Sequence, residues 1–195
     1  MNLNAHFAWA FALWASAEES RSSGNLMLAP IGYYYACFHS SYAYLNAVPG
    51  IAPSTFNRMG HQQLSNLIKQ HLDDDLRKEF DEMRDLRETI NYLGLGDPRG
   101  KLMVLRGHNL RFGTPKDSLS FDEMITKSRD NSRAFIVRML DEVALLPKNA
   151  VDTFPRRGDT EGFWLDEYMQ EDIYLGLMSH EMRVKTYKFV QDILS

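Results

Sequence analysis

Apolar residues recur every three or four positions along most of this chain, the spacing that places them on one face of an α-helix. The pattern predicts helices over about residues 4–19, 30–48, 57–72, 73–93 and 120–146, and a helical C-terminal segment over 162–195. No convincing strand alternation stands out, although residues 102–112 are compatible with a short hairpin. We therefore expect an all-α, up-and-down bundle of five to six helices, forming a single domain over residues 1–195.

The second predicted helix is apolar nearly all round. One stripe follows the helical spacing and consists of Ile31, Tyr34, Phe38, Tyr42 and Leu45. Tyr33, Tyr35 and Tyr44 widen this stripe on both sides. A helix with so little polar surface is typical of the centre of a bundle, where neighbouring helices cover it from several directions.

The fourth predicted helix combines a capped start with an anomaly in its apolar stripe. Asp73 to Asp75 precede it, and their carboxylates suit the free N–H groups and the positive dipole of a helix N-terminus. Leu76, Phe80, Met83 and Ile90 form the stripe, but Arg87 interrupts it. Burying an unpaired guanidinium is costly, so Arg87 must be paired, solvated in a cleft or placed at an interface.

A long segment without helical periodicity covers residues 94–118. Glycine, proline and polar residues dominate it, and we expect a loop. It carries four positively charged candidates for contact with RNA phosphate or an acidic partner: Arg99, Lys101, Arg106 and Arg111. The alternative is an ordinary solvated loop in which these charges have no ligand.

Composition restricts the function further. The formal net charge is −4, whereas proteins that hold nucleic acid by non-specific electrostatics are usually basic, so any RNA contact requires a local basic patch. Cys37 is the only cysteine, which excludes an intrachain disulfide, and we expect no metal and no other cofactor. The apolar stretch 7–17 follows a segment without Lys or Arg, so we interpret it as a core helix of a cytoplasmic protein that does not enter a membrane.

Three stretches together resemble the HEPN family, the higher eukaryotes and prokaryotes nucleotide-binding domain. Residues 33–45, reading YYYACFHSSYAYL, resemble the tyrosine-rich second helix of that family. Residues 61–64, HQQL, open a helix where many members have a histidine, and residues 86–92, LRETINY, are similar to the end of the fourth helix. A weaker similarity covers residues 132–143, and the likeness extends over about residues 26–143.

The resemblance implies an activity and a set of site residues. Many HEPN proteins are metal-independent ribonucleases in which an arginine, followed four to six residues later by a histidine, acts at the interface of a homodimer. Arg87 matches the arginine, with Arg84 as a second candidate, but Asn91 and Tyr92 stand where the histidine would follow. Asparagine has no pKa useful for proton transfer. His39 and His61 are the candidates that could approach the same cleft from other helices, and each could equally be a structural or surface histidine.

Three functions therefore stay open. The first is a HEPN-like protein of a prokaryotic RNA-linked toxin–antitoxin or defence system that binds RNA, a nucleotide or a cognate protein partner and forms a homodimer. The second is a metal-independent endoribonuclease that uses Arg87 with His39 or His61. The third is a non-catalytic structural or adaptor subunit, in which Arg87 pairs with a buried carboxylate of another helix.

Overall fold

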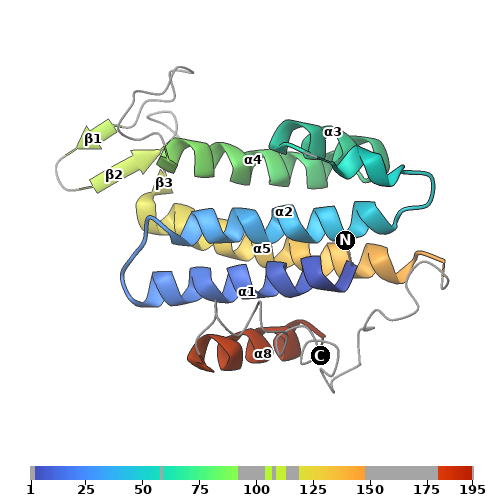
Figure 1. Cartoon of the computed structure of the whole chain (residues 1–195). Helices are drawn as coiled ribbons and strands as arrows, with labels where there is room; N and C mark the ends of the chain where they lie inside the picture. Colours follow the sequence, from blue (N-terminus) through green and yellow to red (C-terminus); the bar gives the residue numbers. More distant parts are fainter. Residues whose placement is uncertain are drawn as a thin grey trace.

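The predicted helical bundle is confirmed. The structure is a computed structural model that describes residues 3–57, 59–91, 104–106, 109–112, 119–147 and 180–194. Within these ranges it contains six α-helices: α1 (Leu3–Ser22), α2 (Ala29–Ala47), α3 (His61–His71), α4 (Asp74–Asn91), α5 (Phe121–Ala144) and α8 (His180–Leu194). Figure 1 shows α1, α2, α4 and α5 side by side, each running opposite to the one before it, with α8 and α4 at opposite sides of the bundle.

Helix α2 occupies the centre, as its nearly continuous apolar surface predicts. It packs against α1, α3, α4 and α5, so most directions around it are covered by another helix. Tyr33, Tyr34 and Cys37 are fully buried there. The core that surrounds them is rich in aromatic and large aliphatic side chains, among them Phe7, Phe11, Leu45, Leu64, Ile68, Phe80 and Phe135. Burial of this apolar surface is the main force that holds the helices together.

Cys37 is a core residue and not an exposed thiol. Its Sγ lies 3.5 Å from the Sδ of Met83 on α4, and burial raises the pKa of the thiol well above its usual value. The thiolate, which is the nucleophilic form, is therefore strongly disfavoured in the folded protein.

The turns that separate the helices follow the glycine and proline signals of the sequence. Gly24 and Gly50 adopt left-handed backbone conformations, with φ of 81° and 92°, directly after α1 and near the end of α2. A short 3₁₀ helix, Pro53–Phe56, then leads toward α3. The prediction that the third helix begins near residue 57 is wrong by about one turn, because Gly60 is extended, with φ −91° and ψ 170°, and α3 begins at His61.

Part of the predicted loop over residues 94–118 has regular structure. Strands β1 (Val104–Arg106), β2 (Asn109–Phe112) and β3 (Leu119–Ser120) form a three-stranded antiparallel sheet in the order β1-β2-β3. Val104 pairs with Arg111, and Phe112 pairs with Leu119. This small sheet is an addition to the helical bundle at the end where α4 stops and α5 begins (Figure 1).

The structure describes only part of the helical segment predicted over residues 162–195. Helix α8 accounts for residues 180–194 of the expected helical segment 162–195 and packs against α1. Residues 162–179 lie outside the described residues. Among the helices that the structure describes, none combines the length and the apolar character that crossing a lipid bilayer requires.

Candidate functional site

Arg87 lies where three helices meet. Helix α2 contributes Tyr34 and Tyr35, α3 contributes its first residue, His61, and α4 contributes Arg87. The backbone N–H of Gly60 donates to the Oε1 of Gln63 at 2.9 Å, which caps the start of α3 and fixes the position of His61 next to it. The tyrosine pair and the histidine are thus placed around the one arginine that interrupts the apolar stripe of α4.

The Arg87 guanidinium rests on aromatic rings and not on a carboxylate. Its Cζ lies 5.5 Å from the ring centre of Tyr34 and 5.6 Å from that of Tyr35, within the range of cation–π attraction. Its Nη2 lies 3.5 Å from the Tyr35 hydroxyl and 3.4 Å from the Nε2 of His61, while its buried Nε has no acceptor. No Asp or Glu among the described residues forms an ion pair with Arg87; the acids nearest along α4 pair with Arg84 instead.

The contacts of His61 determine which ring nitrogen carries the proton. An arginine can only donate, so the Nε2 that faces Arg87 must supply a lone pair. The other nitrogen, Nδ1, then carries the hydrogen and donates it to the Tyr34 hydroxyl at 2.5 Å. His61 therefore has a basic lone pair directed at the guanidinium and a fixed ring orientation, the arrangement of an oriented general base.

The electrostatic surroundings keep this histidine neutral at pH 7. Burial lowers the pKa of His61 first, and the positive charges of Arg87 and Arg84 lower it further, while the Glu88 carboxylate acts in the opposite direction. The pKa therefore lies below the ordinary value of 6.5. A neutral imidazole beside a guanidinium can take a proton from a hydroxyl while the arginine stabilises negative charge on a neighbouring phosphate.

Arg84, one turn before Arg87, is largely neutralised by acids of its own helix. Its guanidinium pairs with Asp81 at 3.1 Å, Asp85 at 3.7 Å and Glu88 at 3.9 Å. It also donates to the Oε1 of Gln62 at 3.2 Å. Arg84 therefore has much less unpaired charge to offer an anion than Arg87 has.

His39 belongs to a different cluster, between α1 and α2. Its Nδ1 lies 3.0 Å from the Nδ1 of His6, and its ring stacks near Trp9 at 6.2 Å. The ring of Phe38 contacts both His39 and His61, at 5.6 Å and 5.1 Å, so it lies between the two histidines. The structure thus brings His61, but not His39, to Arg87.

The remaining predicted site residues are described only in part. Asn91 is the last residue of α4, and the structure describes its backbone but not its side chain. Arg106 and Arg111 lie on β1 and β2, for which the structure describes the backbone alone. Tyr92, Arg99 and Lys101 lie outside the described residues.

Tyr34 and Tyr35, which the sequence pattern places in the apolar surface of the second helix, belong to the site as well. The sequence feature that indicates this is the run of three tyrosines at 33–35, because neighbouring residues of a helix point about 100° apart and cannot all face one core layer.

Among the described residues, no three His, Cys, Asp or Glu side chains gather where they could hold a metal ion. No protein-family model matches the chain, and no curated protein matches it significantly.

Proposed function

We propose that this chain is a HEPN-like RNA-binding protein whose Arg87–His61 pair cleaves RNA without a metal ion. The observation that carries the proposal is the 3.4 Å approach of Arg87 Nη2 to a neutral His61 Nε2, with no carboxylate on the guanidinium. The histidine that the family motif would place after Arg87 on α4 is supplied from the start of α3 instead. The RNA class, and the place in a toxin–antitoxin or defence system, come from the resemblance.

The geometry supports attack by a ribose 2′-hydroxyl on the adjacent phosphate. When Arg87 turns its Nη2 from His61 to the phosphate, the Nε2 lone pair becomes available for the 2′ proton. His61 Nε2 then accepts that proton, O2′ forms the new bond to phosphorus, and Arg87 stabilises the charge on the phosphorane oxygens. The P–O5′ bond then breaks and leaves a 2′,3′-cyclic phosphate. Tyr35 receives a hydrogen bond from Arg87 at 3.5 Å, and its own hydroxyl hydrogen has no acceptor among the described residues, so it can donate to the leaving oxygen.

The experiment is cleavage of a fluorescent RNA oligonucleotide in EDTA, with variants chosen to preserve the fold. His61→Asn retains a donor near Nδ1 for Tyr34 but has no titrating lone pair, and Arg87→Gln retains a polar, unbranched side chain without the charge. Each should lower the cleavage rate by about 100-fold or more, since general-base and electrostatic contributions are of that order. His71→Asn, at the exposed end of α3, is the matched control and should cleave at the wild-type rate.

The pH profile separates this proposal from contamination by another nuclease. Since only neutral His61 can act as the base, the rate should rise as pH increases through a pKa below 6.5 and then level off. Wild-type protein that cleaves no RNA at high concentration, or cleavage that survives both substitutions, would overturn the catalytic assignment.

Binding without cleavage is the second candidate, favoured by the uncompensated charge of Arg87 against two tyrosine rings. In that case an RNA with 2′-O-methyl groups should bind the wild-type protein, and Arg87→Gln should weaken the binding by about tenfold, the value of one charge-assisted contact. A homodimer, which the resemblance implies, is part of the same proposal, and sedimentation velocity on the same preparations tests it.

A further inference from the structure

A second site candidate lies on the other side of the bundle, between α1, α5 and α8. It is an open pocket of about 320 Å³. Its lining contains five basic side chains, Arg21, Arg129, Arg133, Lys185 and Lys188, but only three acidic ones, Glu18, Glu19 and Asp192. In a chain whose formal net charge is −4, this local excess of positive charge is opposite to the average and indicates an anionic ligand.

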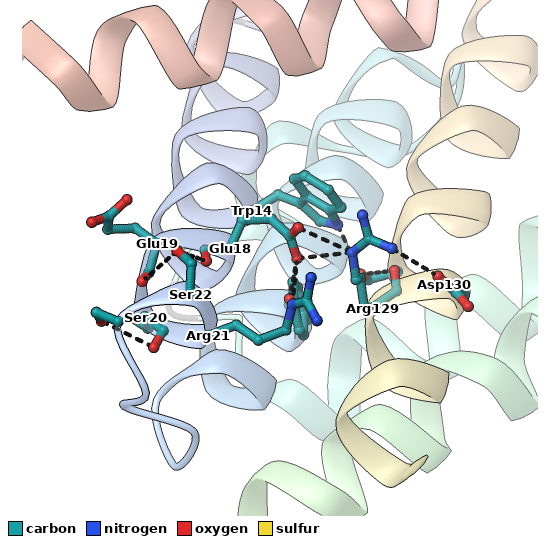
Figure 2. Close-up of polar contacts among 11 residues, drawn as sticks. Trp14, Glu18, Glu19, Ser20, Arg21, Ser22, Arg129 and Asp130 are labelled. Atoms are coloured by element: carbon teal, nitrogen blue, oxygen red, sulfur yellow. Dashed lines mark hydrogen bonds and ion pairs between the residues drawn. The ribbon is translucent and has the colours of Figure 1, made fainter. Parts of the chain in front are cut away.

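One carboxylate positions the two inner arginines. Both oxygens of Glu18 accept from the Nε of Arg129, each at 3.0 Å, and Glu18 also accepts from the Tyr33 hydroxyl. The Nε of Arg21 lies 3.5 Å from the same carboxylate. Figure 2 shows Glu18 between the two guanidinium groups, one from α1 and one from α5. Because Glu18 meets both arginines through Nε, their outer nitrogens are left for another acceptor.

Those outer nitrogens are largely unused. The Arg21 side chain makes no hydrogen bond within the described part of the chain, and Arg129 Nη1 has only a long contact with Asp130, at 3.5 Å (Figure 2). On the rim, Arg133 donates to the backbone oxygen of Asp192 at 3.4 Å. Lys188 is exposed and has no ion pair among the described residues, whereas Lys185 is paired with Glu19.

The apolar wall of the pocket limits what kind of ligand can enter. Trp14 and Phe189 stack face to face, 3.7 Å apart and nearly parallel, and both are buried. The Trp14 indole N–H donates to Ser132 Oγ at 3.0 Å, and Arg129 Cζ lies 5.8 Å from the Trp14 ring. These rings face each other, so they are not free to stack on a base. The wall instead excludes water beside the cations, which strengthens their attraction for an anion.

We propose that this pocket binds a small polyanion with adjacent phosphate groups, either inorganic pyrophosphate or the phosphate tail of a nucleotide. Arg21 and Arg129 would contact one phosphate through their outer nitrogens, and Arg133 and Lys188 the second. Arginine forks suit the tetrahedral oxygens of phosphate, and two phosphates match two pairs of cations. The site is separate from Arg87, because the pocket is formed by α1, α5 and α8.

Isothermal titration calorimetry with pyrophosphate at low salt tests the site in the full chain. The wild-type protein should bind one pyrophosphate, and the Arg133→Gln/Lys188→Gln double variant should raise the Kd at least tenfold. Lys78→Gln/Lys127→Gln removes the same charge from exposed positions on α4 and α5 away from the pocket, and its Kd should stay within about twofold of the wild type. No binding, or equal binding by both double variants, would overturn the proposal.

Two further titrations identify the source of the phosphate groups. A nucleoside triphosphate that binds as tightly as pyrophosphate places recognition in the phosphates alone, and tighter binding adds a contact to the nucleoside; either supports the site. Binding of the unphosphorylated nucleoside with the affinity of the triphosphate would contradict it. Arg21→Gln, which removes an inner cation whose side chain makes no hydrogen bond among the described residues, should weaken pyrophosphate binding without lowering the melting temperature.

Discussion

At the scale of single residues, Gly32 sets how closely α1 and α2 approach. A Cβ at this position would lie 2.8 Å from the Cβ of Ala17 and 3.1 Å from the backbone oxygen of Leu13. Both of those atoms belong to a neighbouring helix and cannot rotate away. The contact between the first two helices, which is among the most extensive in the bundle, therefore depends on the absence of a side chain at residue 32.

Gly32→Ala should destabilise the protein although glycine-to-alanine changes inside helices normally stabilise. The intrinsic gain is about 0.5–1 kcal/mol, whereas overpacking a rigid core contact costs about 1–3 kcal/mol. Urea unfolding should show a net loss of stability. Adding Ala17→Gly removes the closest clashing carbon, so the double variant should lose less than the sum of its single changes; strict additivity would show that the contact does not exist.

Of the residues around Arg87, the arginine itself could be predicted from the sequence, but its histidine partner could not. Arg87 could be found because a charge that breaks an apolar stripe of α4 is a local signal, visible within one helix. Its partner could not be chosen from the histidines of the chain, because the approach of His61 depends on how α3 crosses α2 and α4. His39 has the same residue type and lies on α2 itself, yet it faces His6 on α1.

At the scale of elements, α4 has the cap that its sequence predicts. The carboxylate of Asp73 accepts from the backbone N–H of Leu76 at 2.7 Å and also pairs with Arg138 on α5. The hydrogen bond to Leu76, followed by the charge of Arg138, holds the pKa of Asp73 below its usual value. One side chain thus begins a helix and links it to its neighbour.

Asp73→Ala should lower the free energy of unfolding by about 1 kcal/mol, the usual cost of a lost N-cap. Asp73→Asn keeps an acceptor for Leu76 and removes only the charge, so it should cost less than half as much. Asp75→Ala removes a carboxylate whose ion pair, among the residues that the structure describes, is the surface contact with Lys78, and its effect should stay within about 0.5 kcal/mol. Equal losses for the Asp73 and Asp75 alanine variants would contradict the capping role.

Element boundaries were less predictable than element types. Phe56, one residue before the predicted start of the third helix, lies in a 3₁₀ turn, and its ring packs on Tyr42 at 5.1 Å. Helix α3 begins only at His61, because the backbone of Gly60 is extended. Strands β1, β2 and β3 could not be predicted firmly because each has at most four residues. An alternation of apolar and polar residues over so short a stretch cannot be distinguished from chance.

At the scale of the whole molecule, the packing of α1 on α2 makes stability depend on pH. Burial, followed by the neighbouring His39, lowers the pKa of His6 to about 4, and burial lowers the pKa of His39 to about 4 as well. In the unfolded chain both histidines return to an ordinary pKa near 6.5. Between pH 6.5 and pH 4 the unfolded state therefore binds more protons than the folded state.

Stability should accordingly be complete above pH 6.5 and fall as the pH decreases toward 4, by on the order of 3 kcal/mol for each of the two histidines. The lowered pKa of His61 acts in the same direction, whereas the raised pKa of Glu79 opposes it near the acid end of this range. Urea unfolding at a series of pH values measures the slope. His6→Gln should flatten it, whereas the exposed His71→Asn should not; an unchanged slope in the first variant would contradict this origin.

The position of Cys37 gives the protein a built-in reporter of its own opening. Since this is the chain's single thiol, and it is enclosed beside Met83 on the central helix, an alkylating reagent can reach it only when the bundle separates. The labelling rate in native buffer therefore follows the population of opened molecules, without denaturant and without any engineered probe.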